Sequence, residues 1–117
     1  MPIVCSVIGN AASAHPYGLD AKKAVDIARE NVAKHLHCDT QEIIFTSGAT
    51  ESINLALKGV FESYAAKGNH IITVATEHKA VLDTCKNLEN KGAEITYLKV
   101  DKNGLIDLDE LKNSIKP

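Results

Sequence analysis

The chain has 117 residues, 44% of them hydrophobic and 24% charged, which suits one small globular domain with its own core. A net charge of −2, aromatic residues at 4% and the absence of Trp disfavour binding to nucleic acid or to an anionic membrane surface. No apolar run approaches the length that crosses a bilayer.

The three cysteines form an odd and widely spaced set, Cys5, Cys38 and Cys85, which argues against a disulfide framework and favours a reducing compartment. Residues 1–8 have neither the basic start and cleavage site of a signal peptide nor the Arg-rich pattern of a transit peptide. We therefore expect a cytoplasmic protein.

The first part of the chain is predicted to be a loop followed by a helix. Gly9 and Pro16 punctuate an irregular stretch over residues 1–16. From Leu19 to Leu36 apolar residues recur every three or four positions, which predicts one amphipathic helix. Its apolar stripe consists of Ala21, Val25, Ala28, Val32 and Leu36.

The next stretch is the centre of the sequence. Residues Glu42–Thr46 are predicted to form a strand, followed by a tight turn of small polar residues and a helix from Ser47 to about Lys67. We expect Ser47 to be the N-cap of that helix. Gly68 and Asn69 then stop the helix.

This turn suits an anion. The first backbone N–H groups of a helix have no partner inside it and lie at the positive end of the helix dipole. Gly48 lets a phosphate approach the backbone, and the Thr50 hydroxyl adds a donor. From these residues alone two interpretations stay open, a phosphate cradle and an ordinary cap that packs the helix.

The remaining chain alternates between strands and helices. The nearly continuous apolar run in the first of these strands is typical of a sheet covered on both faces. The predicted elements are a strand at His70–Ala75, a polar turn at residues 76–79, a helix to about Lys91, a strand at Glu94–Val100, a turn at residues 101–104 and a short helix capped by Asp107.

This alternation predicts an α/β fold with a mostly parallel sheet. In such sheets ligands bind beyond the carboxyl ends of the strands. Ser47–Thr50 and Thr76–His78 both follow predicted strands, so the two turns could share one site.

Three segments together resemble the cysteine desulfurases, which are pyridoxal 5'-phosphate (PLP) enzymes of the aminotransferase class-V family. They are residues 9–18 (GNAASAHPYG), 45–59 (FTSGATESINLALKG) and 76–85 (TEHKAVLDTC), and the likeness continues through residues 104–108 (GLIDL). It favours the group that supplies sulfur for iron–sulfur cluster assembly. The resemblance implies the aminotransferase-like architecture of fold type I, with residues 1–117 as the amino-terminal segment of the large PLP-binding domain.

The resemblance also assigns roles. Ala49 and Thr50, next to Gly48, correspond to the residues that bind the cofactor phosphate. His78 corresponds to a histidine that stacks on the pyridine ring and assists proton transfer, which suits an imidazole. Without the resemblance, a solvent-facing turn histidine is the better interpretation of His78.

Other functional groups of the family have no counterpart in residues 1–117. They are the Schiff-base lysine, the aspartate that pairs with the pyridinium nitrogen, and the persulfide-carrying cysteine. Lys58 and Lys79 match ordinary family positions, and Cys85 lies on the apolar stripe of a helix, so none of them is a replacement. We expect an amino-terminal piece of a desulfurase that is inactive alone. With the central strands missing, exposed sheet edges and bare apolar faces are expected.

The implied parent reaction takes sulfur from L-cysteine and leaves alanine and an enzyme persulfide. By the same resemblance the partners are a sulfur-acceptor scaffold protein and a second copy in a homodimer. Two alternatives stay open: a non-catalytic remnant that binds phosphate or a protein, and a related enzyme that acts on another amino acid. We expect no metal site, because His35, His37 and Cys38 have no partner pair at zinc-ligand spacing and suit a polar helix end.

Overall fold

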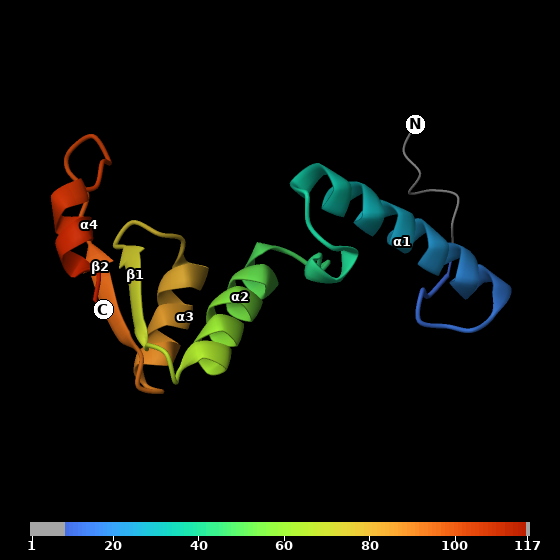
Figure 1. Ribbon diagram of the computed structural model, residues 1–117, viewed down its shortest axis with the longest axis horizontal. Helices are drawn as coiled ribbons and strands as arrows, with labels where there is room; N and C mark the ends of the chain where they lie inside the picture. Colours follow the sequence, from blue (N-terminus) through green and yellow to red (C-terminus); the bar gives the residue numbers. More distant parts are fainter. Residues whose placement is uncertain (1–8, 117) are drawn as a thin grey trace. The chain divides into compact units, whose positions relative to one another are not determined.

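The computed structural model describes residues 9–116, and their contacts form two compact units that meet in the sequence between Phe45 and Thr46 (Figure 1). Each unit has its own elements. No helix among residues 9–116 is both long and apolar enough to cross a membrane.

The first unit is built on helix α1, Pro16–Leu36. Pro16 occupies its first turn, where the missing N–H costs nothing, and the His15 side chain accepts the Gly18 N–H at 3.2 Å. The helix therefore begins three residues before the predicted start. It ends at His37, which adopts the left-handed conformation with φ of 54°.

The predicted strand at Glu42–Thr46 is wrong. Thr40–Glu42 forms the short 3₁₀ helix η2, and the following residues have no regular structure. A strand needs a neighbour to complete its ladder of hydrogen bonds. Within residues 9–116 no segment pairs with this one; instead the Arg29 guanidinium donates to the Ile43 carbonyl and lies 4.9 Å from the centre of the Phe45 ring.

The second unit contains the sheet. Its elements are α2 (Ala49–Tyr64), β1 (His70–Val74), α3 (Lys79–Glu89), β2 (Glu94–Leu98) and α4 (Leu108–Ser114). The two strands run parallel, with Ile71 opposite Ile95, which confirms the predicted parallel sheet. Asp107 caps α4 as predicted, because its carboxylate accepts the Asp109 and Glu110 N–H groups.

The core of this unit lies between α3 and the sheet. Cys85, Leu88 and Leu98 are its largest fully buried side chains. The first two belong to α3 and Leu98 to β2, the strand that pairs with β1. Helix α2 packs against α3 (Figure 1). The predicted position of Cys85 on the apolar side of α3 is confirmed, because the residue is fully buried.

The prediction that β1 is covered on both faces is wrong, since all five of its residues are half-buried. Among residues 9–116 the sheet has two strands, and the helix contacts of this sheet, from α3 and α4, fall mainly on β2. The expectation of bare apolar surface is confirmed: Phe45, Val60 and Tyr64 are 49%, 60% and 52% exposed.

Candidate functional site

The turn before α2 is held by a carboxylate that the sequence interpretation overlooked. The predicted N-cap, Ser47, is wrong, because the cap position is Gly48, which offers no side chain. Ser47 instead donates its N–H and its hydroxyl to one oxygen of Glu51, at 2.7 and 2.6 Å. These two hydrogen bonds, the one from the hydroxyl first, hold the pKa of the Glu51 carboxyl below its ordinary value.

A second pair of side chains closes the other side of the turn. The Thr46 and Ser52 hydroxyls lie 2.6 Å apart, so one donates to the other, and both lie within hydrogen-bond distance of the Gly48 carbonyl oxygen, at 3.2 and 3.3 Å. The contacts recorded for the turn therefore occupy the Ser47 amide and the Gly48 carbonyl.

What these contacts leave open is a group of donors. Among the described residues no acceptor is recorded for the amides of Gly48, Ala49 and Thr50 or for the Thr50 hydroxyl. A Cβ added at Gly48 would meet nothing within 4 Å, so the space above the first turn is open. Three free amides at the positive end of a helix, in open space, fit a phosphate group.

His78 follows the carboxyl end of β1 and is the N-cap residue of α3. Its Nδ1 accepts the Ala80 N–H at 3.1 Å, and the side chain is otherwise exposed. Helices α2 and α3 lie side by side and begin at the same end of the second unit (Figure 1). This arrangement brings the Gly48–Thr50 turn and His78 to one end, while their joint use in a site stays a prediction.

The residues that the sequence analysis rejected as catalytic groups or metal ligands make contacts within the fold. Cys85 is fully buried, and burial first, then the charges of Glu89 and Glu77, raises the pKa of its thiol. Lys79 pairs with Asp83 at 2.8 Å along α3. The His35 Nδ1 contacts the Asn31 carbonyl at 2.7 Å. Across residues 9–116 no three His, Cys, Asp or Glu side chains gather as metal ligands.

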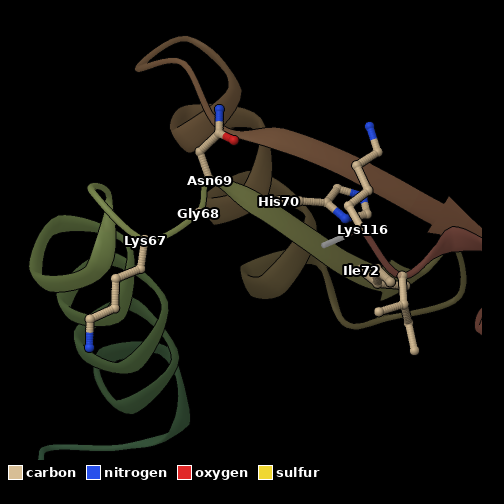
Figure 2. A pocket seen from close by; sticks show the side chains of 7 residues that line it. Lys67, Gly68, Asn69, His70, Ile72 and Lys116 are labelled. Atoms are coloured by element: carbon tan, nitrogen blue, oxygen red, sulfur yellow. The ribbon is translucent and has the colours of Figure 1, made fainter.

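A cavity of about 540 Å³ lies at the amino end of β1 (Figure 2). His78 follows the opposite, carboxyl end of that strand. Two of the cavity's polar lining groups already have partners. The His70 Nε2 lies 2.8 Å from the Thr96 hydroxyl, and the Lys116 ammonium pairs with the Glu94 carboxylate. The hydrogen bond from Lys116 also lowers the pKa of Glu94. We therefore do not include this cavity in the candidate site.

Two contributors to the site were missed from the sequence, Glu51 and the Ala80 amide. The signal for Glu51 was a serine followed four residues later by a glutamate, which is one residue longer than a capping box. The Ala80 amide carries no sequence signal, because every residue but proline has an N–H.

The aminotransferase class-V family model matches residues 5–117. The cysteine desulfurase IscS of Buchnera aphidicola subsp. Baizongia pistaciae is 60% identical over 109 residues, which cover 92% of this chain and 27% of that protein. The cysteine desulfurase IscS of Neisseria meningitidis serogroup C (strain 053442) is 54% identical over 117 residues, 99% of this chain and 29% of that protein.

Solved structures are similar over nearly all of the chain. A NifS-like protein superposes with a TM-score of 0.83 at 44% identity, covering 97% of this chain and 31% of its own. A structure described as SspA in complex with cysteine gives a TM-score of 0.80 at 39% identity, with 97% and 33% covered. These likenesses confirm the predicted α/β fold class. The chain spans less than a third of the length of these curated relatives.

Proposed function

Because the chain belongs to the aminotransferase class-V family, we propose that residues 1–117 form the amino-terminal segment of the large cofactor-binding domain of a cysteine desulfurase. The parent reaction removes sulfur from L-cysteine, leaves alanine and stores the sulfur as an enzyme persulfide for iron–sulfur cluster assembly. High identity to two proteins named cysteine desulfurase IscS supports this proposal.

The cofactor of the proposed reaction is pyridoxal 5'-phosphate, which supplies an electron sink when bound. Within this chain the amides of Gly48, Ala49 and Thr50 and the Thr50 hydroxyl would hold its phosphate. His78 would lie against its ring and handle a proton there. Glu51 would act indirectly, by fixing Ser47 and with it the turn.

The proposed substrate is L-cysteine, and the solved structure described as SspA in complex with cysteine supports this choice of ligand class. We further propose that the intact enzyme is a cytoplasmic homodimer that passes sulfur to a scaffold protein. Exposed apolar side chains such as Leu55 and Val60 form the kind of surface that the rest of the domain or a second copy would cover.

The single observation that carries the proposal is the open first turn of α2, where amides and a hydroxyl have no recorded protein acceptor among residues 9–116. A turn that existed only to cap the helix would give these donors a side-chain oxygen, as serine or aspartate does at other helices. Here the cap position is glycine, and the neighbouring serine is bound to Glu51.

Binding of pyridoxine 5'-phosphate tests this proposal. This probe carries the phosphate and the pyridine ring but no aldehyde, so it cannot attach covalently to lysines. We expect the chain to bind it more tightly than pyridoxine, which lacks the phosphate. Thr50→Ala is expected to weaken the affinity on the order of tenfold, because a hydrogen bond to a charged group is lost.

Ser63→Ala is the matched control. It also removes an exposed hydroxyl from α2, but near the last turn, and should leave the affinity unchanged. Equal affinity for the phosphorylated and unphosphorylated probes, or equal losses in the two variants, would contradict the proposal.

A further inference from the structure

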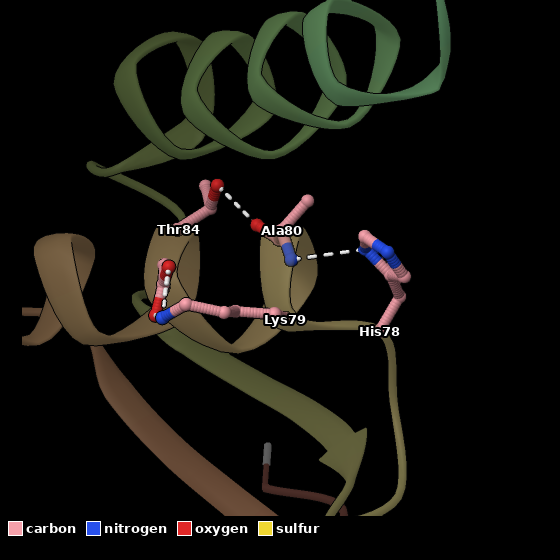
Figure 3. A network of polar contacts seen from close by, with 5 residues as sticks. His78, Lys79, Ala80 and Thr84 are labelled. Atoms are coloured by element: carbon pink, nitrogen blue, oxygen red, sulfur yellow. Dashed lines mark hydrogen bonds and ion pairs between the residues drawn. The ribbon is translucent and has the colours of Figure 1, made fainter.

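His78 and the first turn of α3 form a small polar network (Figure 3). The His78 Nδ1 lies 3.1 Å from the Ala80 backbone nitrogen. His78 itself has φ of −60° and ψ of 144°, the extended backbone of an N-cap residue. The imidazole therefore takes the place that a serine or aspartate oxygen usually takes at the start of a helix.

This contact determines where the imidazole carries its proton. A backbone N–H can only donate, so Nδ1 must accept through its lone pair. A neutral imidazole has one N–H, and with Nδ1 unprotonated that hydrogen belongs to Nε2. The geometry thus selects one of the two tautomers.

The Ala80 peptide is itself held in place. The Thr84 side chain is 4% exposed, and its hydroxyl donates to the Ala80 carbonyl at 2.7 Å (Figure 3). The donor to His78 therefore belongs to a turn anchored in the core of the unit.

We propose that the Ala80 amide is a positioning group for His78, which fixes the neutral imidazole as the tautomer with its proton on Nε2. This inference rests on the proposed function for its catalytic meaning. The other ring nitrogen of His78, Nε2, then carries the hydrogen and is a hydrogen-bond donor. A proton taken up by this imidazole enters the Nδ1 lone pair, and the bond from Ala80 is lost.

The chain provides an internal reference. The His35 Nδ1 lies 2.7 Å from the Asn31 carbonyl, which can only accept, so His35 must carry its proton on Nδ1. His78 and His35 are thus expected to be opposite tautomers in one sample.

The test is imidazole ¹⁵N spectroscopy of the uniformly ¹⁵N-labelled full chain, without cofactor, at a pH about two units above the ordinary histidine pKa near 6.5. His78 should show the Nε2–H pattern and His35 the Nδ1–H pattern. A scalar coupling across the hydrogen bond should join the Ala80 ¹⁵N to the His78 Nδ1.

Two proline variants separate the amide from the helix. Ala80→Pro removes the donor from the first turn, where proline is tolerated. Lys79→Pro is the matched control: it places proline at the first helical position, after a residue that is already extended, and keeps the Ala80 N–H. Ala80→Pro should abolish the coupling and return His78 to the tautomer mixture seen in the urea-unfolded chain, whereas Lys79→Pro should change neither.

The inference is overturned if wild-type His78 shows the Nδ1–H pattern, shows the mixture of the unfolded chain, or lacks the coupling. It is also overturned if a folded Ala80→Pro variant keeps the wild-type pattern. If that variant does not fold, the wild-type coupling and pattern decide. These measurements use no cofactor. A failure to bind pyridoxine 5'-phosphate would therefore contradict the proposed function without affecting the tautomer result.

Discussion

At the scale of single residues, Glu51 determines which hydrogen-bond donors of the candidate site remain available to a ligand. By accepting from both donors of Ser47, it removes them from the turn and leaves the amides of Gly48–Thr50 as the free donors. An ionised carboxylate accepts hydrogen bonds more strongly than a protonated one, so the strength of these two bonds is tied to the charge of Glu51.

The sign of the resulting pH dependence follows from the lowered pKa of Glu51, whose ordinary value is 4.5. A lowered pKa means that the contribution of these bonds is complete above pH 4.5 and is lost as the pH falls through the folded-state pKa. The Ser47 amide proton shift should therefore titrate with a midpoint below 4.5.

Two variants make this titration specific. Glu51→Gln should abolish it, whereas Glu62→Gln, which removes a carboxylate paired with Lys91 at 3.6 Å, should leave it unchanged. A midpoint at or above 4.5 would show that Ser47 does not hold Glu51 in solution.

At the scale of elements, Gly18 explains how the loop over residues 10–13 lies against α1. It is buried, and a Cβ there would lie 2.4 Å from the Ser13 carbonyl oxygen and 2.8 Å from that of Asn10. Because both obstacles are backbone atoms, the loop has to move. We expect Gly18→Ala to lower the free energy of unfolding by about 1–3 kcal/mol, measured by urea denaturation.

Gly59→Ala is the opposite case. Gly59 lies inside α2, and a Cβ there meets nothing within 4 Å, so the usual helix preference for alanine should stabilise by about 0.5–1 kcal/mol. If Gly18→Ala were neutral or stabilising, the close approach of the loop would be wrong.

The helices were predictable from the sequence because their hydrogen bonds are local. α1, α2, α3 and α4 were each foreseen within a few residues, and Asp107 was recognised as a cap from its own neighbours. The strand predicted at Glu42–Thr46 is absent, and its absence could not be foreseen from local sequence, since a strand forms only if another segment pairs with it. The apolar run Ile43 to Phe45 was predicted to be part of a strand, but no described segment pairs with it, and Arg29, fourteen residues earlier than Ile43, donates to the Ile43 carbonyl.

The site was predictable in part for the same reason. Helix chemistry pointed to Gly48 and Thr50, whose binding role stays a prediction, whereas the cap itself was misassigned, because the Ser47 side chain had two acceptable partners and took Glu51. His78 was assigned through a family resemblance, and the Ala80 amide that orients it became visible only in the structure.

At the scale of the whole molecule, the proposed function depends on the turn before α2 and the turn before α3 acting together. They lie 26 residues or more apart in the sequence and come to one end of the second unit because β1 runs parallel to β2 and α2 packs on α3. A phosphate at one turn and an aromatic ring at the other is the arrangement that a phosphorylated pyridine requires.

The most direct test of this claim is to map two ligands on the ¹⁵N-labelled chain. Inorganic phosphate should shift the amides of Gly48, Ala49 and Thr50 and leave the His78 ring protons in place. Pyridoxine 5'-phosphate should shift the same amides and also move the His78 ring protons, because its ring lies against the imidazole. The proposal would be contradicted if either ligand shifted other residues instead of these amides. It would also be contradicted if pyridoxine 5'-phosphate left the His78 ring protons unshifted.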